Sequence, residues 1–169
     1  MFWESILIGI LSGFIASAIF FIVLFLVRPR LKISNDICKR NTNLNEIIHQ
    51  IKIVNLTRSM LSNLHYSLQY EVSNGDGTSN VTEIKPSKSC LFYIDKYSRK
   101  DKDANYAVRI SFDIDETIHK LDNNSCYTFT FYAQHGFSNT TSCIKKKYMK
   151  CNIRKGVFET GKSIKIINS

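Results

Sequence analysis

The chain begins with an unbroken apolar run. Residues 6–27 carry no charged side chain and are mostly Ile, Leu, Phe and Val. As an α-helix the run would be about 33 Å long, enough to cross the hydrocarbon core of a bilayer. A cleaved signal peptide is the main alternative, because Ala16-Ser17-Ala18 resembles a small-residue cleavage site. No basic residue precedes the run and it continues well past Ala18, so we predict a transmembrane helix over 6–27 after a short external N-terminus over 1–5.

After this run, apolar and polar residues alternate with a period of two, as in strands with one buried face. The strongest examples are residues 63–72, 106–114 and 126–133, which turn side chains such as Leu68, Tyr106 and Phe129 toward a core. Weaker strand candidates are residues 31–37, 47–55, 81–85, 90–95, 143–151 and 157–161.

Turn-forming sequences separate these candidate strands. The clearest is SNGDGTSN at 73–80, because Asn-Gly and Asp-Gly pairs readily adopt the backbone conformations of tight turns. Seven to nine short strands with no second convincing helix predict an all-β domain over 28–169. We expect an antiparallel Ig-like β-sandwich, with a small β-barrel as the alternative.

Small side chains recur every four residues within the apolar run. Ser5, Gly9, Gly13 and Ser17 would form one stripe along a helix face. Transmembrane helices associate closely over such small residues, although Gly and Ser are also common in membrane helices generally. We interpret the stripe as a helix-packing face and expect a homo-oligomer.

Positive charge is distributed unevenly around the apolar run. The first five residues contain no Lys or Arg, whereas Arg28, Arg30 and Lys32 follow the run directly. The positive-inside rule therefore predicts a single-pass protein of the bacterial inner membrane, with its N-terminus outside and its β-domain in the cytoplasm.

The net charge of +9 is concentrated near the C-terminus, where residues 145–165 hold eight basic residues and one acid, Glu159. Three interpretations remain open: attraction to anionic lipid, binding of a phosphate-bearing ligand such as a nucleotide signal, or a solvated edge strand. Free nucleic acid is not expected, because no nucleic-acid-binding motif is present. The candidate lipid- or phosphate-binding residues are Arg28, Arg30, Lys32, Lys145, Lys146, Lys147, Lys150, Arg154 and Lys155.

The sequence contains no motif for catalysis or metal binding. Its five cysteines include no CxxC pair and its four histidines are scattered, which favours free thiols in a reducing compartment over a zinc site. Calcium is disfavoured because the acidic loop near Asp101 also carries several lysines and an arginine. We expect no enzyme activity, catalytic residue, metal or cofactor.

The apolar segment SILIGILSGFIASAIFFIVLFLV, the exit RPRLKIS and the alternating strands together resemble a known architecture. It is that of the small bacterial membrane-anchored β-domain effectors of antiphage defence, of the cyclic-oligonucleotide or retron type. The better-known β-barrel effectors of that type carry two spans, whereas one is predicted here. The resemblance implies an effector whose β-domain binds a ligand or partner and whose helices cluster to perturb the membrane. The alternative is a membrane-anchored scaffold or accessory subunit that recruits a partner protein.

Overall fold

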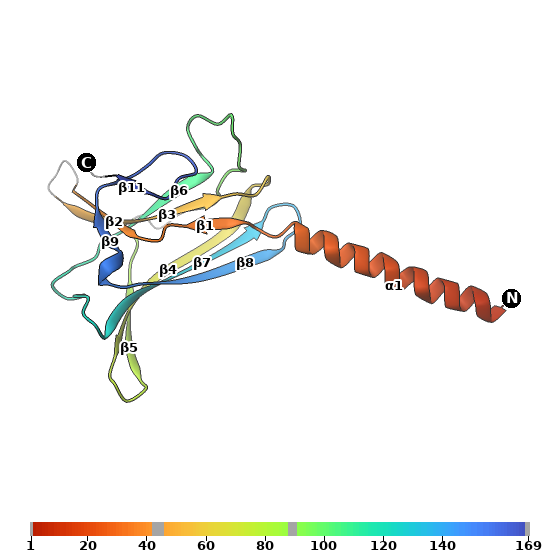
Figure 1. Cartoon of the computed structure of the whole chain (residues 1–169), viewed down its shortest axis with the longest axis horizontal. Coiled ribbons are helices and arrows are strands. Elements are labelled where there is room, and N and C mark those ends of the chain that lie inside the picture. The colour runs from red at the N-terminus through yellow and green to blue at the C-terminus, as the bar shows by residue number, and fades with distance from the viewer. Residues whose placement is uncertain (1, 42–45, 88–90, 168–169) are drawn as a thin grey trace.

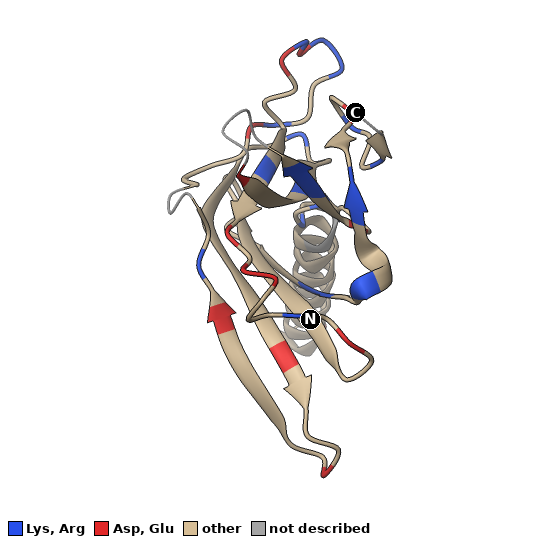
Figure 2. Cartoon of the chain, turned by 90° about the vertical axis from the view of Figure 1, so that its left-hand side faces the viewer, with Lys and Arg blue, Asp and Glu red and all other residues tan. Residues whose placement is uncertain are grey.

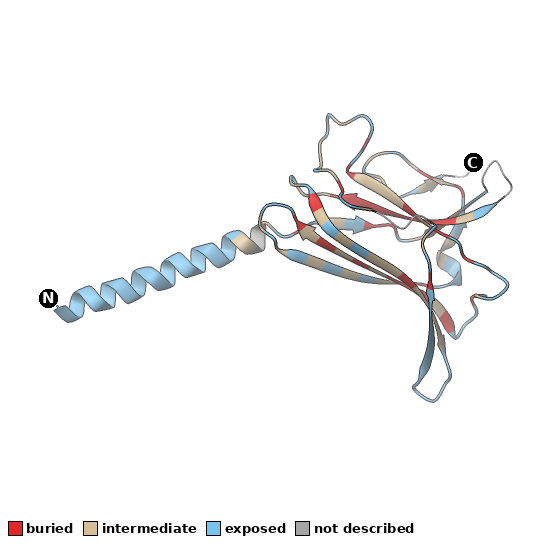
Figure 3. Cartoon of the chain, turned by 180° about the vertical axis from the view of Figure 1, so that it is seen from behind, coloured by how far each residue is buried: buried red, intermediate tan, exposed pale blue. Residues whose placement is uncertain are grey.

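The computed structural model describes residues 2–41, 46–87 and 91–167, and it begins with a long helix, α1 (Phe2–Leu26), that projects from a β-rich domain (Figure 1). Its residues 2–23 are all exposed (Figure 3). The segment Phe2–Leu24 has a mean hydropathy of 2.7, so α1 is long and apolar enough to cross a membrane; a signal sequence has the same properties. The apolar run therefore forms the predicted helix, which starts before Ile6 and ends before Val27.

The helix ends at a proline and is then fastened to the domain. Pro29 has no N–H group and disfavours a helical conformation in the residue before it. The Arg30 amide donates to Thr57 Oγ1 at 2.9 Å, and the Leu56 amide donates to the Arg30 carbonyl at 2.8 Å. The chain leaving α1 is thus hydrogen-bonded directly to the loop at 56–60.

The first sheet is built around one central strand, β3 (Ile47–Asn55), and it curls (Figure 1). One edge of β3 pairs antiparallel with β1 (Leu31–Ile33) and β2 (Ile37–Asn41), and its other edge pairs antiparallel with β6 (Ala107–Phe112). The short strand β9 (Ile153–Lys155) joins β2 in parallel.

The second sheet is antiparallel throughout. Its order is β5–β4–β7–β8, formed by β5 (Ser79–Ile84), β4 (Leu61–Ser73), β7 (Ser125–His135) and β8 (Thr141–Tyr148). The predicted turn joins β4 to β5, with Gly75 and Gly77 at φ of 81° and 86°. These values favour glycine and explain the Asn-Gly and Asp-Gly pairs.

One apolar core lies between the two sheets. Ile37, Ile51 and Ile53 of the first sheet and Leu68 and Phe129 of the second belong to the same fully buried cluster (Figure 3). Phe112 meets Phe129 edge to face across the core, with ring centroids 6.0 Å apart. The prediction of a mostly-β domain with Leu68, Phe112 and Phe129 facing inward is confirmed.

The outer face of the first sheet is covered by the C-terminal segment 156–167. This segment contains the antiparallel pair β10 (Val157–Phe158) and β11 (Ile166–Ile167). Lys52, which is 1% exposed, donates from Nζ to the Ser163 and Glu159 carbonyls, and Arg109 Nη2 donates to the Phe158 carbonyl at 3.0 Å. Strand β3 is therefore buried on both faces. An alternation of apolar and polar residues predicts burial of one face only.

Several strand predictions need correction. The structure shows no strand at 91–95, where only Ile94 forms an isolated bridge with Leu61; Cys90 lies outside the described residues. The strand expected over 31–37 breaks at Ser34–Asp36 into β1 and the start of β2, and the one over 157–161 shortens to β10. The strand over 143–151 starts earlier and stops at Tyr148, before a short 3₁₀ helix, η1 (Lys150–Asn152). Tyr106 is buried, but in a second cluster with Val54 and Ala104, because it precedes β6.

Candidate anion-binding site

A hollow of about 400 Å³, here called the distal pocket, lies at the end of the domain opposite α1. Strand β8 begins beside α1, where Thr140 Oγ1 donates to the Val27 carbonyl, and it runs for about 24 Å before reaching η1. Figure 2 looks onto this far end, with basic residues on β9 and η1. The lining residues are Lys39, Glu116, His119, Lys120, Leu121, Tyr127, Lys150, Ile153 and Lys155.

The distal pocket has an excess of positive charge. Glu116 is the one carboxylate among its lining residues, and it is bound by Lys39. Among the described residues, Lys120, Lys150 and Lys155 form no ion pair, so three of the lysines that line the hollow have no fixed counter-ion. A second hollow of about 350 Å³ shares Lys39 and Lys155 with it and adds Arg40.

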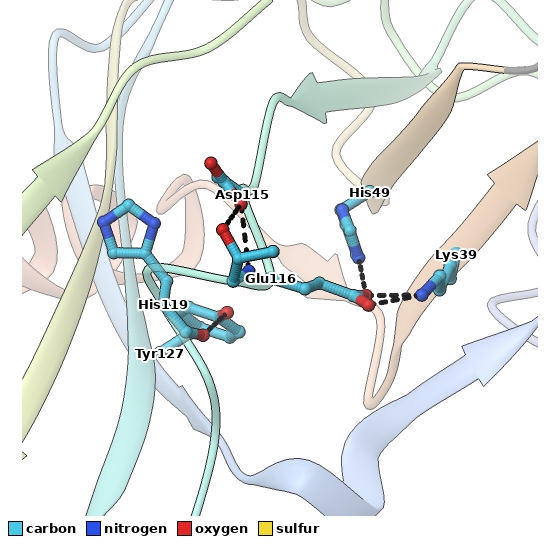
Figure 4. Close-up of polar contacts among 7 residues, drawn as sticks. Lys39, His49, Asp115, Glu116, His119 and Tyr127 are labelled. Carbon is cyan, nitrogen blue, oxygen red and sulfur yellow. Dashed lines mark hydrogen bonds and ion pairs between the residues drawn. The ribbon is translucent and has the colours of Figure 1, made fainter.

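Glu116 is fixed by two partners on the first sheet (Figure 4). Lys39 Nζ donates to both of its carboxylate oxygens at 2.6 Å, and His49 Nε2 lies 2.9 Å from Oε1. The hydrogen bond from Lys39 lowers the pKa of Glu116, which therefore stays ionised. Burial lowers the pKa of His49 below its ordinary value of 6.5 despite the carboxylate, so a neutral imidazole donates to Glu116 at pH 7.

The loop that carries Glu116 and Lys120 is ordered by its own polar groups. Asp115 Oδ1 accepts from the Thr117 amide at 2.9 Å and from the Thr117 hydroxyl at 2.6 Å. The Tyr127 hydroxyl, at the base of the pocket, donates to the His119 carbonyl at 2.6 Å (Figure 4). Burial raises the pKa of Tyr127, which keeps this donor protonated. The loop therefore presents Lys120 to the hollow from a fixed backbone.

The predicted basic residues divide into separate groups in space. Lys150 and Lys155 line the distal pocket, whereas Arg154 pairs with Asp36 at 3.2 Å outside that lining. Arg28, Arg30 and Lys32 lie at the exit of α1, at the other end of the domain. The basic C-terminal segment is thus not one continuous surface.

The three lysines of β8 point to opposite faces of the second sheet. Lys145 and Lys147 lie on its outer face, 3.8 Å and 3.1 Å from Glu71. Lys146 lies on the inner face near the edge of the first sheet, where Nζ donates to Asn35 Oδ1 at 2.7 Å. The β8 lysines are therefore engaged with partners within the domain.

Three of the five lysine and glutamate residues that line the distal pocket were not predicted as site residues from the sequence. Lys39 comes from β2, and Glu116 and Lys120 come from the loop between β6 and β7. No spacing in the sequence joins these positions to Lys150 and Lys155. They meet because β9 pairs in parallel with β2, which places Lys155 opposite Lys39.

The small-residue stripe lies on an open face of α1. A Cβ atom added at Gly9 or Gly13 would meet nothing within 4 Å. The Ser17 hydroxyl donates to the Gly13 carbonyl at 2.8 Å, so this polar group has its hydrogen-bond acceptor within the helix. At Gly9 and Gly13 this face of α1 therefore has room for the close approach of a neighbouring helix.

The lysines that line the distal pocket suit it to binding anions. Among the described residues, no group of three His, Cys, Asp or Glu side chains could hold a metal ion. The cysteines within the described ranges are free thiols, and Cys38 donates to the Gly156 carbonyl. No protein-family model matches the sequence, and no curated protein is similar to it. The function is therefore inferred from the chemistry of the site.

Proposed function

We propose that this protein is a non-enzymatic, single-pass inner-membrane protein whose cytoplasmic β-domain binds a phosphate-bearing ligand in the distal pocket. The observation that carries this proposal is the set of three lysines, Lys120, Lys150 and Lys155, around a hollow whose one carboxylate is already bound. Ammonium groups without counter-ions raise the local concentration of anions and bind phosphate as point charges.

The size and walls of the pocket favour a small ligand. A hollow of about 400 Å³ lies within the range of small-molecule sites. Leu121 and Ile153 add apolar wall beside the lysines, which suits a ligand with a planar or apolar part as well as phosphate. A nucleotide signal has both properties, so it is the ligand class that we favour.

We further propose that ligand binding is coupled to clustering of α1 through the stripe Ser5, Gly9, Gly13 and Ser17, as in a membrane-perturbing defence effector. The alternative is a scaffold that uses the same surface to recruit a partner protein. As for the fold, we favour a β-sandwich over a closed barrel, because no two strands pair between the sheets among the described residues. The link there is a single bridge, between Pro86, just after β5, and Phe112 of β6.

The pocket is tested with two matched double variants of the full chain in detergent micelles. Calorimetric titration with ATP should show binding that Lys150→Gln/Lys155→Gln weakens by about 100-fold, because two charge-assisted contacts are lost. Lys145→Gln/Lys147→Gln removes the same charge from the outer face of the second sheet and should change the affinity less than threefold. Equal losses in both variants would mean general charge attraction, and unchanged binding in the first would refute the pocket.

Topology is tested separately with reporters fused to the C-terminal end. A reporter that works only in the cytoplasm should be active there, and one that works only in the periplasm should be silent. Periplasmic activity would reverse the proposed orientation and place the free thiols in an oxidising compartment.

A further inference from the structure

Another hollow, of about 680 Å³, lies where α1 meets the β-domain. We propose that this hollow, here called the helix-exit pocket, binds the phosphate headgroup of an anionic lipid in the leaflet where α1 ends. This site is distinct from the distal pocket. The inference rests on the proposed membrane anchoring by α1. The charged and aromatic residues that line the helix-exit pocket are Arg28, Arg30, Arg58, His135 and Phe137.

The position of the pocket follows from the end of the apolar segment. Val27 is the last apolar residue before Arg28, and both residues line the hollow. With α1 across a bilayer, arginines directly after its last apolar turn lie at headgroup level. The pocket therefore opens at the depth where lipid phosphates lie.

The loop that supplies Arg58 is built by a buried amide. Asn55 is fully buried, and its Nδ2 donates to the Ser59 carbonyl at 2.9 Å and to the Asp95 carbonyl at 2.8 Å. Its Oδ1 accepts from the Thr57 amide at 2.8 Å. The same loop holds the Arg30 backbone through Thr57 Oγ1. The backbones that carry Arg30 and Arg58 are thus tied to each other before any ligand arrives.

The charge of the helix-exit pocket comes from its arginines. No Asp or Glu stands among its lining residues, so the charged residues that line the hollow are three arginines. Guanidinium binds phosphate oxygens in pairs, which makes arginine well suited to this anion. His135 adds no charge, because Nδ1 accepts from the Ser138 amide at 3.1 Å and burial lowers the pKa of the ring.

An exposed aromatic side chain indicates lipid rather than a soluble anion. Phe137 is 88% exposed on the turn between β7 and β8, and it lines the same pocket. That turn is fixed, because the Gly136 amide donates to the Met60 carbonyl at 2.9 Å. The backbone approaches so closely here that a Cβ atom at position 136 would lie only 2.9 Å from the same oxygen. Met60 is also exposed. An aromatic ring held beside guanidinium groups at a helix exit suits the interfacial region of a bilayer.

The test measures lipid retention by the full chain in detergent micelles, using native mass spectrometry and thermal shift. Phosphatidylglycerol and phosphatidylcholine with the same acyl chains are compared, with glycerol 3-phosphate as the soluble anion. We expect preferential binding of phosphatidylglycerol, weakened about 25-fold in Arg30→Gln/Arg58→Gln, since each basic residue near a membrane surface contributes about a fivefold factor. Arg154→Gln, on the far end of the domain, should bind like the parent.

Equal retention of the two lipids, or an equal loss in Arg154→Gln, would overturn the lipid site. Tight binding of glycerol 3-phosphate that excludes phosphatidylglycerol would assign the pocket to a soluble anion and overturn the inference as well. Flotation with vesicles separates this inference from the proposed anchoring. A chain that fails to float with vesicles of either lipid refutes both the anchoring and the lipid site. A chain that floats equally with either lipid and shows no headgroup preference refutes only the lipid site.

Discussion

Replacing Phe129 with alanine tests whether the two sheets share one core. Phe129 is fully buried on β7 and contacts Phe112 of the opposite sheet at 6.0 Å between ring centroids. Truncating such a side chain costs about 3–5 kcal/mol. For a domain of this size, 1 kcal/mol corresponds to about 3–4 °C in Tm, so we expect Tm to fall by about 10–18 °C.

The edge-to-face contact adds a term that a double-mutant cycle isolates. Phe112→Ala, Phe129→Ala and the double variant should show a coupling of about 0.5–1.5 kcal/mol, because each single change already removes the contact. Thermal unfolding of the full chain in micelles, followed by circular dichroism near 218 nm, measures it. Phe92→Ala, whose ring is 77% exposed, should change stability by less than about 0.5 kcal/mol. Additive effects of Phe112 and Phe129 would refute the packing of the two sheets around one core.

Two further predictions concern Lys52 and the stripe on α1. Burial lowers the pKa of Lys52 from 10.5 to about 8. Between pH 8 and 10.5 the Lys52 amine is therefore protonated in the unfolded chain but not in the folded one. Its contribution to the free energy of unfolding rises with pH over this range, by about 3 kcal/mol in all. Urea unfolding from pH 7.5 to 10.5 should show that rise in the parent but not in Lys52→Met, and identical profiles would contradict the burial of the ammonium group. Gly9→Ile and Gly13→Ile should abolish crosslinked oligomers while membrane insertion persists, whereas Leu11→Ile should not. Oligomers in all three variants would make the stripe incidental.

The parts of the fold that could be predicted are those with a long, one-sided pattern. Alternation over 126–133 predicted the buried face of β7, since one side of that strand meets the core and the other does not. Strands β9 and β11 are too short to show a period, and they form because β2 and β10 offer them an edge. Residues 91–95 look like a strand in composition, but only Ile94 of them is buried in the core, and it forms one isolated bridge without joining a sheet.

The candidate site was harder to predict than the fold. Lys150 and Lys155 stood out because they belong to a basic run, and Arg28 and Arg30 because they follow an apolar one. Lys120 and Arg58 lie in segments without such bias, and they and Lys39 reach their pockets only through strand pairing and loop geometry. The distribution of charge along the chain therefore indicated what could bind, but not where the binding groups meet.

The parallel pairing of β2 with β9 has a consequence for the order in which the molecule is made. Ile37 pairs with Ile153, so the first sheet cannot be completed until nearly the whole chain has left the ribosome. The apolar helix emerges before the β-domain, so a chain anchored by α1 as proposed would reach the membrane long before that. Its β-domain would then complete folding while already tethered, with the edge of β2 open until β9 arrives. An unpaired edge of this kind is a site of wrong pairing between neighbouring chains, and a tether that gathers chains in one plane increases that hazard.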